Sequence, residues 1–237
     1  MLDSTQVRRV GMLAPMQSEL EPIVRKLDLD DERDGVLYRG RAGNVEVVAM
    51  LTTMGMAAAA DATRRMIELD VDLVMVVGIA GGVSQSSVRI GDVIVPEVVI
   101  ERATGRQFAP SWFHDHAPRG HLSCGDDLIL DQTVLDGMHE LGVIAVDMET
   151  AAAAAVCDAA GVPWAVFRSI SDYAGEGLVD QSLFAMTNPD GTADVDAITK
   201  WLEANPDKME VLTRLARDAQ LATEAASDAA IRACLAL

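Results

Sequence analysis

Three carboxylates follow apolar runs of this chain and supply groups for acid–base chemistry. Asp147 and Glu149 directly follow a short apolar run, and Asp172 closes a second one at residues 164–170. Between the two runs, an unbroken alanine-rich segment at 148–160 predicts a helix. In open α/β sheets, ligands bind outside the carboxyl ends of the strands. This strand–helix–strand unit therefore predicts a pocket mouth that carries two or three carboxylates.

A fourth carboxylate, Glu19, lies near the start of a helix predicted to run to about Leu27 after a strand at 7–14. Taken alone, it is a first-turn acid that complements the helix dipole. Its place at a strand-to-helix exit also fits a ligand site. Arg168, four residues before Asp172, has two equally supported interpretations. It pairs with carboxylates inside the pocket, or it is a surface residue at a strand end.

Composition limits the class of protein. The chain has 237 residues, half of them hydrophobic, and predicts one large domain over residues 1–237. Its net charge of −18 excludes nucleic acid as a partner, because such a field repels a polyphosphate backbone. The odd number of cysteines (Cys124, Cys157 and Cys234) favours a reducing cytoplasm. No secretion signal or membrane-spanning segment is predicted.

Strands and helices alternate along the chain, which predicts an α/β fold with a mixed, largely parallel sheet. Residues 28–34 read as a charged loop. Gly78 to Gly82, directly after an apolar strand, allow close backbone approach to a ligand, although a tight turn explains them equally well. The other predicted elements are a hairpin at 36–41 and 45–52, a helix at 57–69, the apolar strand at 73–77, and strands at 93–95 and 98–100.

The second half holds two less regular regions. Residues 102–127 predict a mobile loop, and a metal site at His114, His116 and His121 is less favoured than a solvated loop or pocket lid. The remaining predicted elements are a helix at 131–141, a loop at 173–180, a short helix beginning at 183–186, a turn at 187–191, a helix at 197–202 and a long helix at 208–237. The long helix is expected to pack on the sheet or on a second subunit through an apolar face of Leu212, Leu215, Ala216, Ala219, Ile231 and Leu235.

Four segments occur in an order that resembles the nucleoside phosphorylase superfamily: GMLAPMQSEL, VVGIAGGV followed by RIGDVIV, AVDMETAA, and RSISDYA. The chain is most similar to the 5′-methylthioadenosine/S-adenosylhomocysteine nucleosidases, over about residues 7–172. The resemblance implies a three-layer α/β/α sandwich around a twisted mixed sheet, and a homodimer. It also implies hydrolysis of a purine nucleoside in methionine salvage, with water as nucleophile and with no metal or organic cofactor.

The resemblance also assigns roles to residues. Asp172 matches the acid that protonates or hydrogen-bonds N7 of the leaving purine, Glu149 the carboxylate that holds the ribose hydroxyls, and Glu19 the base that activates water. The implied substrate-binding residues are Ile79, Ala80 and Gly81 as a floor, Met148 under the sugar, and Met54, Leu128, Ile129, Asp147, Arg168 and Ser171.

These roles fit the chemistry of N-glycosidic cleavage. The sugar becomes cationic, oxocarbenium-like, while negative charge builds on the base. An acid at the base neutralises the leaving group, and a carboxylate beside the ribose stabilises charge that exists only in the transition state. The acid needs a pKa raised by burial or by a neighbouring carboxylate, whereas the other carboxylates should stay ionised.

The nucleophile and the substrate are less firmly indicated. Met75 to Val77 precede the glycines where phosphorylases of this superfamily carry an arginine, and Glu19 would repel phosphate, so water is favoured. A phosphorylase and a non-catalytic nucleoside-binding module remain the alternatives. Ile79 replaces an expected serine or threonine, and Leu128 an expected phenylalanine, so the base and the 5′ substituent stay open. Arg89 and Arg102 remain cations without an assigned role.

Overall fold

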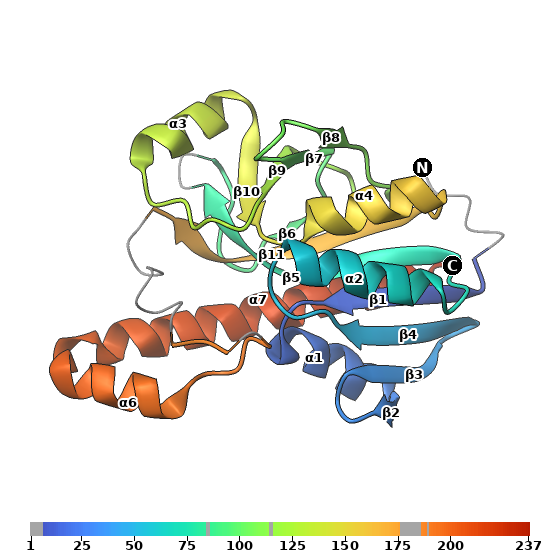
Figure 1. The fold of residues 1–237 in the computed structure, drawn as a ribbon, viewed down its shortest axis with the longest axis horizontal. Helices are drawn as coiled ribbons and strands as arrows, with labels where there is room; N and C mark the ends of the chain where they lie inside the picture. Colours follow the sequence, from blue (N-terminus) through green and yellow to red (C-terminus); the bar gives the residue numbers. More distant parts are fainter. Residues whose placement is uncertain (1–6, 84–85, 114–115, 176–185, 189) are drawn as a thin grey trace.

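The chain folds around one mixed sheet of eleven strands (Figure 1). The computed structural model describes residues 7–83, 86–113, 116–175, 186–188 and 190–237. The strands are β1 (Arg9–Ala14), β2 (Asp30–Arg33), β3 (Leu37–Ala42), β4 (Val45–Leu51), β5 (Leu73–Val83), β6 (Val93–Ile94), β7 (Val98–Glu101), β8 (Gln107–Phe108), β9 (His121–Cys124), β10 (Val143–Asp147) and β11 (Trp164–Ala174). The helices are α1 (Gln17–Leu27), α2 (Met56–Ile67), α3 (Gln132–Glu140), α4 (Thr150–Ala160), α6 (Val195–Ala204), the short 3₁₀ turn η2 (Pro206–Lys208) and α7 (Met209–Leu235).

Strand β5 lies at the centre of the sheet. The order is β2-β3-β4-β1-β5-β10-β9-β7-β8, and β11 pairs with both β5 and β6. Strands β4, β1, β5 and β11 run parallel, as do β10, β9 and β7. The pairs β2–β3, β3–β4, β7–β8, β6–β11 and β5–β10 are antiparallel. The sheet is therefore mixed, as predicted, with parallel groups joined through an antiparallel β5–β10 contact.

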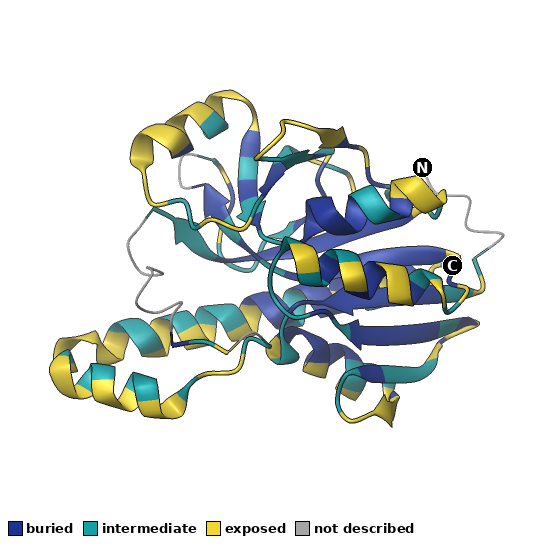
Figure 2. Ribbon diagram, in the orientation of Figure 1, coloured by how far each residue is buried: buried dark blue, intermediate teal, exposed yellow. Residues whose placement is uncertain are grey.

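Helices cover both faces of the sheet, which confirms the three-layer arrangement. Along β5, Val74 and Val76 pack with residues of α2 and α4 on one face. Leu73, Met75 and Val77 point the other way and pack with residues of α1 and α7. This alternation follows from the period of two in a strand, and both faces of β5 are apolar because both are covered. Figure 2 shows the buried central strands between the half-exposed helices.

Two predicted strand ends are wrong. Strand β5 continues through Gly78 to Gly82 instead of turning there, and β11 continues through Asp172. Because β10 runs antiparallel to β5, the carboxylates do not meet at one shared carboxyl edge of parallel strands. They meet in the middle of the sheet, where β10 ends on one side of the long strand β5 and β11 runs along its other side.

Three predicted irregular or apolar regions also need correction. Residues 28–34 contain strand β2, and residues 102–127 contain β8 and β9, which pairs between β7 and β10. In α7, the buried residues are small ones of its second half, Ala222, Thr223, Ala226, Ser227, Ala229, Ala230, Ala233 and Cys234. The predicted face of larger side chains is not buried, and Leu235 is 58% exposed. Close packing of a helix on a sheet selects small residues there, and a search for large apolar residues misses them.

Three further predictions concern the 173–191 region. Gly191 donates its backbone N–H to the carbonyl of Asn188, which confirms the predicted turn, while residue 189 lies outside the described part. The predicted loop at 173–180 is wrong at Tyr173 and Ala174, which belong to β11. The rest of that loop from residue 176, and the start of the helix predicted at 183–186, fall on residues 176–185, which also lie outside the described part. Within the described ranges, no helix is both long and apolar enough to cross a membrane, and no cluster of His, Cys, Asp or Glu is arranged to hold a metal.

Candidate active site

One cavity gathers the four carboxylates singled out from the sequence. Glu19 reaches it from the first turn of α1, Asp147 and Glu149 from the junction of β10 and α4, and Asp172 from β11. The central strand explains this convergence. Gly81 of β5 is paired with Val146 on one side and with Asp172 on the other. A register shift between Ile170 and Asp172 marks a bulge at this point, a common device for redirecting a side chain beside a site.

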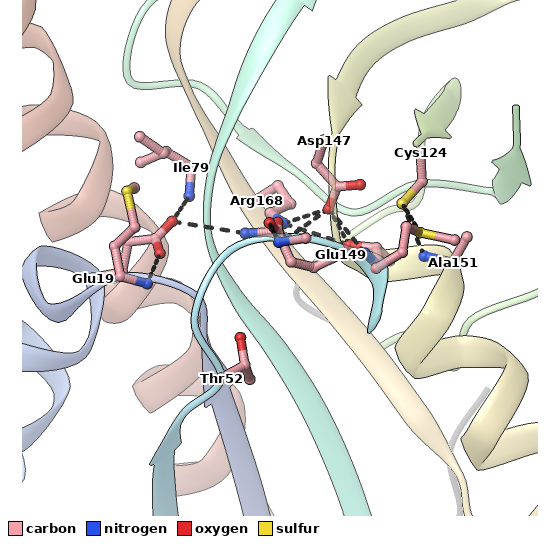
Figure 3. A network of polar contacts seen from close by, with 12 residues as sticks. Glu19, Thr52, Ile79, Cys124, Asp147, Glu149, Ala151 and Arg168 are labelled. Carbon is pink, nitrogen blue, oxygen red and sulfur yellow. Dashed lines mark hydrogen bonds and ion pairs between the residues drawn. The ribbon is translucent and has the colours of Figure 1, made fainter. Parts of the chain in front are cut away.

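Arg168 lies between Glu19 on one side and Asp147 and Glu149 on the other, and contacts all three carboxylates (Figure 3). Its Nη2 lies 2.6 Å from Oδ2 of Asp147 and 2.9 Å from Oε2 of Glu149, and its Nε donates to the same Asp147 oxygen at 2.9 Å. Its Nη1 lies 3.7 Å from Oε1 of Glu19. The side chain is fully buried, so the surface interpretation of Arg168 is wrong. It does not line the cavity either; it holds the residues that do.

Glu149 lines the cavity and accepts hydrogen bonds from two donors. Its Oε2 accepts from Arg168, and its Oε1 accepts at 2.9 Å from the backbone N–H of Gly55, at the start of α2. Burial raises the pKa of Glu149, while the charge of Arg168 opposes that rise. Each donor fixes one carboxylate oxygen, which leaves each oxygen a second lone pair for a ligand.

Glu19 is held by backbone amides as well as by charge. Its Oε1 accepts from the N–H of Ile79 and its Oε2 from that of Met16, both at 2.7 Å. A Cβ at Gly78 would lie 2.2 Å from Oε1 of Glu19, so glycine is required where β5 passes this carboxylate. Burial raises the pKa of Glu19 to about 7, against the lowering effect of Arg168.

Asp172 stands in a different electrostatic setting. Its Oδ1 accepts a hydrogen bond from the Ser171 hydroxyl at 2.5 Å, and within the described residues it forms no ion pair. Burial raises its pKa, and only the Ser171 hydrogen bond opposes this. Of the four carboxylates singled out from the sequence, Asp172 is thus the one without a cation beside it in the described chain to keep it ionised.

Asp147 connects Arg168 to the first turn of α4. Its Oδ2 accepts from Arg168 and from the hydroxyl and backbone N–H of Thr150, in the first turn of α4. Its Oδ1 is buried and has no hydrogen-bond partner within the described residues. Asp147 therefore orients Arg168 and anchors α4, and keeps one oxygen uncommitted.

The family of the chain follows from a comparison with known proteins. The model of the Phosphorylase superfamily matches residues 9–121 and 113–216. This chain belongs to that superfamily. A 5′-methylthioadenosine/S-adenosylhomocysteine nucleosidase from an Exiguobacterium strain is 29% identical over 231 residues, 82% of this chain and 99% of that protein.

Solved structures of this superfamily share the fold. A Neisseria meningitidis nucleosidase of the same name, in complex with methylthio-immucillin-A, has a TM-score of 0.72 and 20% identity over 98% of this chain and all of that one. A Streptococcus pyogenes S-adenosylhomocysteine nucleosidase with 5-methylthiotubericidin gives 0.73 and 19% over 99% of both chains. Futalosine hydrolase of Helicobacter pylori gives 0.67 and 20% over 95% and 96%.

The structure of this phosphorylase-superfamily member brings nearly all predicted binding residues to one cavity. All except Arg168 line it: Met54, Ile79, Ala80, Gly81, Leu128, Ile129, Asp147, Met148 and Ser171, besides Glu19, Glu149 and Asp172. Sequence reasoning missed Met16, Tyr173, Thr187, Gly191, Leu215 and Ala219, which also line it. Met16 could have been found, because it lies in the same strand-to-helix exit as Glu19. Leu215 and Ala219 could not, since their apolar spacing predicts packing on the sheet or on a second subunit and does not indicate a cavity wall.

The buried charge of Glu19 predicts a pH-dependent stability. Its folded-state pKa of about 7 exceeds the ordinary pKa of 4.5 for a glutamate, so deprotonation favours the unfolded chain and stability falls as pH rises from about 5 to 7. Glu19→Gln removes this term. We expect the variant to gain roughly 3 kcal/mol relative to the unchanged protein between pH 5 and pH 8, measured by urea unfolding. Glu21→Gln, at an exposed neighbour on α1, is the control, and parallel pH profiles for both variants would contradict the prediction.

Proposed function

We propose that this protein hydrolyses the N-glycosidic bond of a purine nucleoside related to methylthioadenosine, and releases the free base and a ribose derivative. The observation that carries the proposal is the contrast between two carboxylate settings in one cavity. Burial raises the pKa of all three acids, but the guanidinium of Arg168 opposes that rise at Glu19 and Glu149, whereas Asp172 has no cation beside it in the described chain. Such a division separates groups that act ionised from one that acts protonated.

The proposed reaction has one proton transfer at the sugar and one at the base. Glu19 removes a proton from water, and the water oxygen forms a bond to the anomeric carbon. The bond from that carbon to the base nitrogen breaks, and its electron pair moves into the purine. Asp172 donates its proton to N7, so the base leaves neutral. Glu149 holds the ribose hydroxyls and stabilises the cationic sugar, an interaction that is strongest in the transition state.

Water is supported as the nucleophile by the charges at the floor of the cavity. Arg168 already contacts three carboxylates, and a phosphate beside Glu19 would face that acid directly. The pKa of Glu19, about 7, leaves a large ionised fraction at neutral pH, as a base that activates water requires. A phosphorylase would need a cation that is free to bind phosphate at this point.

The proposal extends to the setting of the enzyme. We infer that residues 1–237 act as one domain, that the enzyme is a cytoplasmic homodimer, and that it serves methionine salvage. The three cysteines are free and buried, which fits a reducing compartment. Similarity to the nucleosidases supports the dimer and the salvage role.

Release of free base tests the proposal directly. The panel holds methylthioadenosine, S-adenosylhomocysteine, adenosine, 5′-deoxyadenosine, inosine and uridine, each with and without phosphate. We expect base release from at least one purine nucleoside at the same rate in both conditions. Release that requires phosphate would replace the proposal by a phosphorylase. Tight binding without release, unchanged in Glu19→Gln, would replace it by a nucleoside-binding module.

A further inference from the structure

Arg102 is a cation in the cavity wall that the proposed mechanism does not use. It directly follows β7, and its backbone N–H donates to the carbonyl of Cys124 at 2.8 Å, which extends the β7–β9 pairing by one residue. Its side chain turns into the lining of the cavity beside Asp127 and Leu128. It is half-buried, so its guanidinium is neither freely solvated nor enclosed in the core.

Backbone groups of the loop after β9 hold the guanidinium of Arg102 in place. Nη2 donates to the backbone carbonyl of Asp127 at 2.7 Å. A Cβ on Gly125 would lie 2.9 Å from that nitrogen and 3.0 Å from Cζ, so the guanidinium lies against the bare backbone of this glycine. A side chain at position 125 would displace it from the wall. The loop after β9 thus fixes the arginine over the cavity.

The charge of Arg102 is not paired with an acid in the part of the chain that the structure describes. Of the described residues that line the cavity, it is the only cation, and Glu19, Asp127, Asp147, Glu149 and Asp172 line it as well. Within the described residues, Arg102 nevertheless forms no ion pair, and its Nε and Nη1 have no hydrogen-bond partner. Arg168 is the opposite case, since it is fully buried and forms ion pairs with three carboxylates. Arg102 keeps its charge and a planar pair of N–H groups available to a ligand.

We propose that Arg102 determines specificity by binding an acceptor oxygen of the nucleoside, a role that rests on the proposed function. The chemistry is an oxygen that accepts from a guanidinium, and two parts of a substrate can supply it. One is the 6-oxo group of a hypoxanthine- or guanine-type base, which would lie near Leu128 and Ile129. The other is a carboxylate on the 5′ substituent. In both cases, the substrate differs from methylthioadenosine, which carries neither group.

Arg102→Met tests the proposal, because methionine keeps much of the length and removes the donors and the charge. The probes are adenosine, inosine, methylthioadenosine and 5′-deoxy-5′-(carboxymethylthio)adenosine. We expect kcat/KM to fall about 10-fold or more for inosine with adenosine unchanged, or for the carboxymethyl compound with methylthioadenosine unchanged. The first result identifies the base as the source of the oxygen and the second the 5′ substituent. Arg102→Lys, which keeps the charge without the fork, should recover only part of the loss.

The outcomes separate this role from a structural one. Arg106→Met is the matched control, since Arg106 stacks on Phe108 and does not line the cavity. An equal loss for all four nucleosides would mean that Arg102 only supports the loop of Asp127, and no loss for any of them would mean that it binds nothing in the cavity. Either result overturns the inference and leaves the proposed hydrolysis intact. Calorimetric binding of free hypoxanthine against free adenine gives a readout independent of turnover.

Discussion

Asp172→Asn is expected to lower kcat by roughly 100-fold or more, with little change in nucleoside binding. The amide has nearly the shape of the carboxyl and can still accept from the Ser171 hydroxyl, but it cannot give a proton to the purine. The loss therefore falls on the step in which charge develops on the base, and not on the affinity for the ground state. Single-turnover base release measures the rate, and titration with the same nucleoside measures affinity.

Two comparisons make this test specific. Asp196→Asn makes the same chemical change in the first turn of α6, at an exposed position, and should leave kcat within about 2-fold. A nucleoside whose base leaves readily without protonation should be less affected by Asp172→Asn than the purine nucleosides, because its leaving group needs less help from an acid. Near-normal turnover of purine nucleosides by Asp172→Asn would remove Asp172 from the mechanism.

The elements around the site were predictable where local signals agree. The helix of α4 follows from its alanines, and the strand core of β5 from a continuous apolar run that both faces of the sheet then bury. Strand β9 was missed because it has only four residues and lies among prolines, glycines and histidines. What makes it a strand is its position between β7 and β10, which is a property of the sheet and not of the segment.

The site was predictable as a set of carboxylates but not as a geometry. The types and places of Glu19, Glu149 and Asp172 were visible in the motifs. The role of Arg168 was not, because burial decides between its two interpretations, and burial follows from the register of β11 beside β5. The need for Gly78 was also hidden, since it depends on a carboxylate 59 positions earlier in the chain coming within van der Waals distance. Contacts of this kind arise only after the sheet has formed.

Arg168→Met is expected to destabilise the fold by about 3–5 kcal/mol near pH 8, because it leaves buried carboxylates without their shared cation. The pH dependence identifies the cause. The charge of Arg168 lowers the pKa of Glu19 and of Glu149. Without it, both folded-state pKa values rise further above the ordinary glutamate value of 4.5. A raised folded-state pKa gives stability that is present at low pH and is lost as pH rises through it.

The loss of stability in Arg168→Met should therefore be smaller at pH 5 than at pH 8, because the folded variant can hold Glu19 and Glu149 protonated at the lower pH. Urea unfolding at the two pH values measures it, with Arg217→Met on the exposed face of α7 as the control. The double variant Arg168→Met/Glu149→Gln should recover part of the loss at pH 8, since it removes one of the uncompensated charges. A loss of equal size at both pH values, without recovery in the double variant, would assign the effect to packing of the arginine stem. Recovery together with a pH-dependent loss would establish that the fold tolerates its cluster of buried acids only because Arg168 lies among them.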